Sequence, residues 1–253
     1  MFDLSGKRFL ITGAGAPQGI GFAAARALHE LGAAVFLTSL SPRILDRASE
    51  LGVSGATADL TNPDEVRSLI AKAVEKLGAL DGVINNAGMT SVVDEAKEEF
   101  SSIDEISLEI WHKSFSRNLD SAFLVTQAAL PFIRKQPGGR IVMVSSATGA
   151  VMAMRETVAY ASSKAALIGM VRALAVDEAA NGITVNAIAP GWITTESQTE
   201  SELVQGFATP IGRSGTPEEV ASAIAWLASP GAAYVTGQII IVDGGNSIAE
   251  ERA

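Results

Sequence analysis

Short apolar runs alternate with longer amphipathic stretches along most of the chain. The apolar runs are continuous rather than alternating, which predicts strands buried on both faces of a sheet, at residues 8–12, 34–38, 53–58, 82–85, 140–144, 184–188 and 238–242. Apolar positions at helical spacing predict helices over residues 20–31, 42–51, 64–77, 108–135, 159–180 and 217–228. Parallel strands need crossover helices, so this order predicts an α/β fold: a Rossmann-like, doubly wound parallel sheet of seven strands with helices on both faces. No linker or repeat interrupts the pattern, and we expect one domain over residues 1–253.

Composition narrows the classes of partner. The net charge of −9 argues against a nucleic-acid or anionic-membrane surface. The chain has no cysteine, and its two histidines, His29 and His112, lie in separate predicted helices, so we expect no metal site. No apolar run approaches the ~20 residues of a membrane span and the first residues do not resemble a leader, so we expect a cytoplasmic protein.

Tyr160 and Lys164 stand four residues apart in a predicted helix, on one face. A cation in that position favours the phenolate and is expected to lower the tyrosine pKa from its usual value near ~10. The same spacing also fits an ordinary tyrosine beside a solvated lysine, so the surrounding motifs must decide.

A glycine-rich turn from Thr12 to Gly21 lies between the first predicted strand and the first helix. Glycines there let the backbone approach a pyrophosphate, and the free N–H groups of a helix start attract an anion; the alternative is a tight turn without a ligand. The second strand ends without a carboxylate, and Ser39, Ser41 and Arg43 follow it. This favours NADP over NAD, unless Arg43 is only a solvated arginine of the first helical turn.

Two further turns follow predicted strands at the same edge of the sheet. Asp59 and Leu60 follow the third strand and can face an adenine, and residues 85–88 (Asn-Asn-Ala-Gly) follow the fourth as a small-residue turn. Ligands of open α/β sheets bind at the carboxyl ends of strands.

This ordered set of motifs resembles the short-chain dehydrogenase/reductase family of single-domain type, and most closely the bacterial 3-oxoacyl-carrier-protein reductases. The resemblance covers nearly the whole chain and also includes Asn118, Ser145-Ser146, Pro190-Gly191, Thr236-Gly237-Gln238 and Asp243-Gly244-Gly245.

The resemblance implies four catalytic residues. Tyr160 is the acid/base, and Lys164 lowers its pKa and binds the nicotinamide ribose. Ser146 binds the substrate oxygen, and Asn118 holds a water that links Lys164 to solvent. Together, the motifs and the resemblance predict cofactor contacts from Tyr160, Lys164, Gly13, Gly15, Gln18, Ile20, Ser39, Arg43, Asp59, Leu60, Asn86, Ala87, Gly88, Pro190, Gly191, Ile193 and Thr194.

Three segments are longer than the family pattern: the glycine turn between Gly13 and Gly19, the loop between Ser146 and Tyr160, and the stretch between Gly88 and Asn118. The acidic part of the last stretch, residues 94–109, is typical of a solvated surface. We expect the loops to shape the substrate pocket, with Ser146, Met152, Tyr160 and Trp192 as candidate contacts, residues 195–207 as a mobile lid, and Met89, Val151 and Met154 as further lining. The alternative is that the methionines only fill gaps in the core.

The resemblance implies an NAD(P)-dependent oxidoreductase that interconverts a secondary alcohol and a ketone. The substrate is expected to be a small-molecule carbonyl or alcohol, with a 3-oxoacyl compound as one candidate. It also implies a homotetramer. A non-catalytic dinucleotide-binding regulatory or scaffold protein on the same fold is the alternative, because fold alone does not fix function. An isomerase or dehydratase using the same tyrosine is a further alternative.

Overall fold

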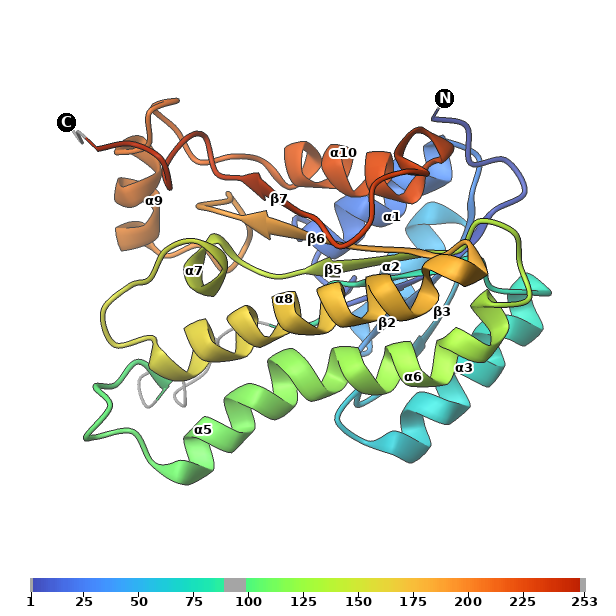
Figure 1. Ribbon diagram of the computed structural model, residues 1–253, viewed down its shortest axis with the longest axis horizontal. Helices are drawn as coiled ribbons and strands as arrows, with labels where there is room; N and C mark the ends of the chain where they lie inside the picture. Colours follow the sequence, from blue (N-terminus) through green and yellow to red (C-terminus); the bar gives the residue numbers. More distant parts are fainter. Residues whose placement is uncertain (1, 89–98, 251–253) are drawn as a thin grey trace.

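Seven parallel strands form one sheet in the computed structural model, which describes residues 2–88 and 99–250 (Figure 1). The strand order is β3-β2-β1-β4-β5-β6-β7, which confirms the predicted doubly wound sheet. The order reverses between β1 and β4, the position at which open α/β sheets bind ligands. The strands are β1 (Arg8–Thr12), β2 (Ala34–Ser39), β3 (Ser54–Thr57), β4 (Gly82–Asn85), β5 (Arg140–Val144), β6 (Thr184–Pro190) and β7 (Ile239–Val242).

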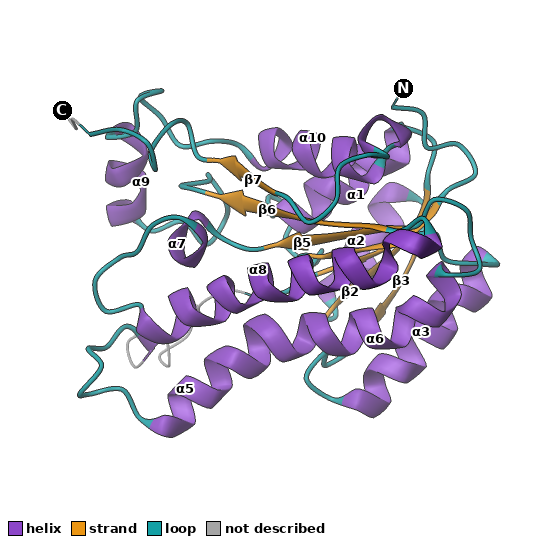
Figure 2. Cartoon of the chain, viewed as in Figure 1, coloured by secondary structure: helices purple, strands orange, loops and turns teal. Residues whose placement is uncertain are grey.

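Helices cover both faces of the sheet (Figure 2). One face packs against α1 (Ile20–Glu30), α2 (Arg43–Leu51) and α10 (Pro217–Ala228). The other packs against α3 (Pro63–Leu77), α6 (Ser121–Ile133) and α8 (Val158–Glu178), with α5 (Leu108–Phe115) continuing the line of α6. Two shorter helices, α7 (Ala147–Ala150) and α9 (Glu200–Phe207), follow β5 and β6.

Side chains alternate between these two cores along each strand. In β1, Phe9 and Ile11 enter the core beneath α1 and α10, whereas Leu10 enters the core beneath α3 and α6. All three are fully buried. Burial on both faces is the reason that the strands appear in the sequence as continuous apolar runs.

The long helix expected over residues 108–135 is interrupted. A π-helical turn, Ser116–Asp120, separates α5 from α6. The helix expected over 159–180 ends in a 3₁₀ turn, Ala179–Asn181, and another such turn, Pro230–Ala232, follows α10. The other predicted elements differ from the structure by one or two residues at their ends.

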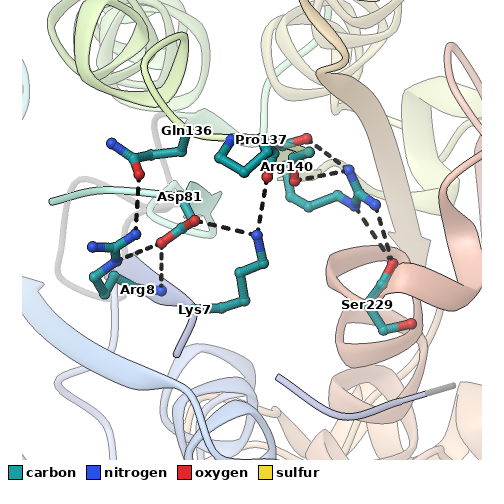
Figure 3. A network of polar contacts seen from close by, with 9 residues as sticks. Lys7, Arg8, Asp81, Gln136, Pro137, Arg140 and Ser229 are labelled. Carbon is teal, nitrogen blue, oxygen red and sulfur yellow. Dashed lines mark hydrogen bonds and ion pairs between the residues drawn. The ribbon is translucent and has the colours of Figure 1, made fainter. Parts of the chain in front are cut away.

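Charged side chains at the amino ends of the strands bind one another (Figure 3). Asp81, only 2% exposed, accepts hydrogen bonds from Lys7 Nζ at 3.3 Å, Arg8 Nε at 2.6 Å and the Arg8 backbone N–H at 3.0 Å. The buried Arg140 guanidinium donates to the backbone carbonyls of Gly138 and Ser229. This edge is a structural network, remote from the motifs at the carboxyl ends of the strands.

Across residues 2–88 and 99–250, no helix has the length and apolar character needed to cross a membrane.

Candidate active site

The turns after β1 and β4 are tied together by one buried side chain. Thr12 Oγ1 accepts the backbone N–H groups of Asn86 and Ala87, each at 3.0 Å, and donates to the carbonyl of Ile84. Asn86 Nδ2 returns hydrogen bonds to the carbonyls of Thr12 and Gly13 at 3.1 Å. The two predicted cofactor segments therefore form one fixed surface at the switch point of the sheet.

Two glycines of this surface have no room for a side chain. A Cβ atom on Gly21 would lie 2.5 Å from Asn86 Nδ2 and 2.6 Å from the Gly13 carbonyl oxygen. Gly13 itself has a φ of +67°, and its Cβ would lie 2.8 Å from the Ala87 Cα. The glycines are required for the close approach of the β1 and β4 turns as well as for a ligand.

The start of α1 is suited to an anion. Its N-cap residue, Gly19, has no side chain to occupy the first backbone N–H groups, and Gln18 beside it is exposed while Ile20 begins the helix. Gly15 lies against Ser39, whose hydroxyl is 2.7 Å from the place of a Gly15 Cβ. The glycine turn and the end of β2 therefore adjoin, as a bound dinucleotide requires.

Arg43, the predicted phosphate ligand, is largely exposed and pairs with Glu196 at 3.6 Å. Its backbone N–H also lies 3.3 Å from the Ser41 hydroxyl. An exposed pair of this kind has little effect on stability, so a competing anion can take over Arg43.

Asp59 and Leu60, after β3, differ in what they can offer. The Asp59 carboxylate accepts the Thr61 N–H and hydroxyl at 2.9 and 2.7 Å. The Leu60 side chain is 8% exposed and belongs to the core, which leaves only its backbone for a cofactor contact.

Asn118 lies within the π-helical turn and is fully buried. Its Nδ2 donates to the carbonyl of Ser114 at 3.0 Å, whereas its Oδ1 has no partner within the described residues. Gly88 packs directly on it, because a Cβ on Gly88 would lie 2.9 Å from Asn118 Oδ1. π-helical turns are frequent at functional sites, and a buried acceptor without a donor is unusual.

The two serines after β5 have different roles. The Ser145 hydroxyl is buried and donates to the backbone carbonyl of Lys164 at 2.9 Å. Ser146 is only partly buried, and its hydroxyl accepts the Thr148 N–H at 3.2 Å. Ser145 fixes the catalytic helix, while Ser146 keeps a hydroxyl near Tyr160.

Tyr160 and Lys164 lie together on α8, with Lys164 Nζ 5.7 Å from the centre of the tyrosine ring. Burial lowers the pKa of Lys164 to about 8, and its Nζ donates to the Val144 carbonyl at 3.2 Å. The expected lowering of the tyrosine pKa is wrong for these side chains by themselves. Burial raises the pKa of Tyr160, hydrogen bonding with Ser146 lowers it, and the charges of Glu99 and Glu202 raise it further.

The segment after β6 is held against the end of the sheet. Gly191 donates to the Val242 carbonyl at 2.9 Å, and its Cβ would lie 2.7 Å from the Asp243 Cβ. Pro190 is buried as the last residue of β6, and Ile193 is 9% exposed. Thr194 is exposed, whereas its neighbour Thr195 is partly buried. The Thr195 hydroxyl was not among the cofactor contacts predicted from this motif.

The predicted substrate contacts come from separate loops. Trp192 and Met152 are partly buried, and Met152 Sδ accepts a contact from Asn246 Nδ2 at 3.6 Å. Glu156, in the lengthened loop before Tyr160, is the one residue other than glycine with positive φ, +59°, in the described chain. Val151 and Met154 are exposed, and Met89 lies outside the described residues.

The acidic stretch contains a residue that sequence interpretation missed. Glu99 is only 4% exposed, although we expected the acidic residues 94–109 to form a solvated surface. Residues 94–98 lie outside the described part of the chain. The only available signal was that this acidic stretch falls just before the helix of Asn118. Within residues 2–88 and 99–250, no cluster of His, Asp and Glu is suited to a metal ion.

The chain is similar in sequence to known proteins. A family model described as enoyl-(acyl carrier protein) reductase matches residues 13–247. The 3-oxoacyl-acyl-carrier-protein reductase FabG of Vibrio cholerae is 37% identical, covering 96% of this chain and 98% of the relative. Oxidoreductase UcpA of Escherichia coli is 36% identical over 99% of this chain and 98% of its own.

Solved structures show the same fold. The ligand-free aldohexose dehydrogenase of Thermoplasma acidophilum superimposes with a TM-score of 0.86 at 29% identity, over 99% of this chain and 97% of that one. A dehydrogenase/reductase of Sinorhizobium meliloti superimposes with a TM-score of 0.87 at 30% identity, over 98% and 97% of the two chains.

Proposed function

This chain belongs to the short-chain dehydrogenase/reductase family of NAD(P)-dependent oxidoreductases, and on that premise we propose that it interconverts a ketone and a secondary alcohol with Tyr160 as the acid/base. The observation that carries the proposal is the meeting of Ser146, Tyr160 and Lys164 beside the surface formed by the β1 and β4 turns. When bound, the nicotinamide supplies or accepts the hydride.

The side chains divide the remaining work. Tyr160 donates its proton to the ketone oxygen, or takes one from the alcohol, and the Ser146 hydroxyl binds that same oxygen. Lys164 presents a cation beside the phenol and would hold the ribose of a bound nicotinamide. The unpartnered Oδ1 of Asn118 is suited to hold a water that returns protons to the site.

Replacement of Tyr160 tests the mechanism. Tyr160→Phe removes the exchangeable proton and keeps the ring, so we expect kcat to fall by about 10³-fold while dinucleotide affinity stays within about 2-fold. Turnover read from the absorbance of the reduced cofactor and binding read from its fluorescence separate the two effects. Wild-type turnover would contradict the proposal, whereas binding without turnover in the parent chain would support the scaffold alternative.

We favour NADP over NAD because Arg43, Ser39 and Ser41 follow β2 and no carboxylate ends that strand. Glu196 is the carboxylate that pairs with Arg43, at 3.6 Å. Arg43→Ala should weaken NADP by about 10-fold and NAD by less than 2-fold, as expected for one charge-assisted phosphate contact. Equal loss for both dinucleotides would show that Arg43 does not bind a phosphate; Arg67→Ala, on the exposed side of α3, is the control.

Substrate class is best approached with a panel of ketones and secondary alcohols, each tested with NADP and NAD. The exposed apolar side chains of α9, Leu203, Val204 and Phe207, favour a substrate with an apolar part. A 3-oxoacyl substrate is one candidate, because FabG of Vibrio cholerae carries that name. The net charge of −9 weighs against an acidic carrier protein as its donor.

We further propose a cytoplasmic homotetramer. β7 is the last strand of the sheet, and all four of its side chains remain partly exposed. Such an edge is suited to packing against another copy of the chain. Sedimentation as a stable monomer would contradict this proposal.

A further inference from the structure

Glu99 is a buried carboxylate for which the mechanism above has no use. It accepts a hydrogen bond from the Ser114 hydroxyl at 2.6 Å and forms an ion pair with Arg117 at 3.0 Å. Carboxylates are almost never buried unless they are paired in this way, and removal of such a group leaves its partners without compensation. Glu99 is therefore fixed to the end of α5 and to the π-helical turn.

Both partners of Glu99 adjoin Asn118. The Ser114 carbonyl accepts the hydrogen bond of Asn118 Nδ2 at 3.0 Å, and Arg117 precedes Asn118 in the π-helical turn. Two residues after Glu99, Ser101 pairs with Thr157 in an isolated β-bridge, directly before α8 and three residues before Tyr160. Residues 99–101 thus connect the turn that carries Asn118 with the helix that carries Tyr160.

We propose that Glu99 is a positioning residue of the active site, which holds the π-helical turn of Asn118 in place and sets a fixed negative charge near Tyr160. This inference rests on the proposed function. It assigns a role to one residue of the stretch between Gly88 and Asn118, which is longer than the family pattern.

The charges around Tyr160 come from three elements. Lys164 lies on the same helix, with its Nζ 5.7 Å from the ring centre, and the negative charges that act on the phenol are those of Glu202 in α9 and Glu99 in the segment before α5. Arg117 and Lys113 line the small space beside Glu99. After the larger effects of burial and Ser146, both glutamates raise the pKa of Tyr160. The phenol is then the favoured form at neutral pH, which is the form that donates a proton in ketone reduction.

Glu99→Gln is the decisive variant, because the amide keeps an oxygen for the Ser114 hydroxyl and removes the charge. Alcohol oxidation needs the phenolate, so its kcat/KM rises with pH through the pKa of Tyr160. Without the Glu99 charge, the rising part of this pH profile moves to lower pH. At a fixed pH on that rising part, kcat/KM for alcohol oxidation should increase by about 3-fold or more. The falling limb of ketone reduction should move in the same direction.

Direct titration gives a readout that does not depend on turnover. The chain has 2 tyrosines, and Tyr234 is fully exposed, so a Tyr234→Phe background leaves Tyr160 as the one phenol. Its phenolate absorbance should develop at lower pH in Glu99→Gln than in the background protein. If no substrate were turned over, this titration would still show whether the Glu99 charge acts on Tyr160. The failure of the proposed function and the failure of the proposal for Glu99 can therefore be told apart.

Two further variants complete the test. Glu99→Leu also loses the acceptor for Ser114, and we expect kcat to fall about 10-fold beyond Glu99→Gln. Glu109→Gln, on the exposed side of α5, should leave both profiles unchanged. An unmoved pH profile and an unmoved phenolate titration in Glu99→Gln, with kcat merely reduced, would overturn the proposal.

Discussion

The two edges of the sheet use polar side chains in opposite ways. At the amino ends of the strands, the buried Asp81 is surrounded by Lys7 and Arg8, and the buried Arg140 donates to three backbone carbonyls (Figure 3). The Asp81 carboxylate is compensated by two cations, and the Arg140 guanidinium by the carbonyl oxygens that it contacts. This edge contributes to folding.

At the carboxyl ends, buried polar atoms lack partners. Asn118 Oδ1, Asn85 Oδ1 and Thr38 Oγ1 accept or donate no hydrogen bond within the described residues. Lys164 is buried as a cation with one carbonyl, that of Val144, as its acceptor. Two of the unpartnered atoms in the described residues lie elsewhere: Thr184 Oγ1 at the amino end of β6 and Arg47 Nε in α2. Unsatisfied groups cost free energy, and three of these five atoms lie at the carboxyl-end edge, where a bound ligand or water would satisfy them.

Of the variants predicted here, Asp81→Asn should have the largest effect on stability, because it disrupts the polar network at the amino ends of the strands. The amide removes the charge that compensates Lys7 and Arg8, and it places an N–H₂ group among their donors. We expect the free energy of unfolding to fall by about 3 kcal/mol, while kcat and KM of the folded enzyme stay unchanged. Denaturant titration and steady-state kinetics give the two values.

Asp64→Asn is the matched control, because Asp64 pairs with Arg67 on an exposed part of α3. Its effect should stay within about 0.5 kcal/mol. A large loss of kcat in Asp81→Asn, at a temperature where it remains folded, would show that the two edges are coupled.

The sequence was sufficient for the features that depend on local pattern. Continuous apolar runs located the strands, and Gly13 and Gly21 located the β1 turn because no other residue fits there. The π-helical turn was not predictable, since one extra residue per turn hardly changes a hydrophobic pattern. The burial of Glu99 and the raised pKa of Tyr160 also escaped sequence interpretation, because they depend on which segments pack over these side chains.

At the carboxyl-end edge, Lys164→Met should have the opposite effect to Asp81→Asn: the protein becomes more stable and loses activity. The buried cation has its pKa lowered from 10.5 to about 8, which corresponds to about 3 kcal/mol at pH 7. Methionine removes that cost and also the hydrogen bond to Val144, worth about 1 kcal/mol. We expect a net gain of about 2 kcal/mol and a loss of turnover by orders of magnitude.

The pH dependence of the free energy of unfolding tests whether the buried charge of Lys164 causes this gain in stability. In the parent protein, Lys164 loses its proton near pH 8 in the folded state and near pH 10.5 in the unfolded state. Between those values the unfolded state binds more protons, so the free energy of unfolding of the parent protein rises with pH. The advantage of Lys164→Met in denaturant titrations should therefore be complete below pH 8 and should shrink toward pH 10.5. Lys72→Met, at an exposed position of α3, is the control and should show no such trend. An advantage that did not change with pH would mean that the buried charge is not its cause.

The smallest expected effect concerns the backbone of the substrate loop. Glu156 adopts a φ of +59°, a conformation that costs an L-residue with a Cβ about 1 kcal/mol. Glu156→Gly should relieve this strain and raise the free energy of unfolding by about 0.5–1 kcal/mol after the entropy of glycine is included. Glu156→Ala removes the same carboxylate but keeps the Cβ, so the difference between the two variants measures the strain alone. If glycine were no more stable than alanine, the loop would not be strained, and the cost of function at this edge would reside in its unpaired polar side chains alone.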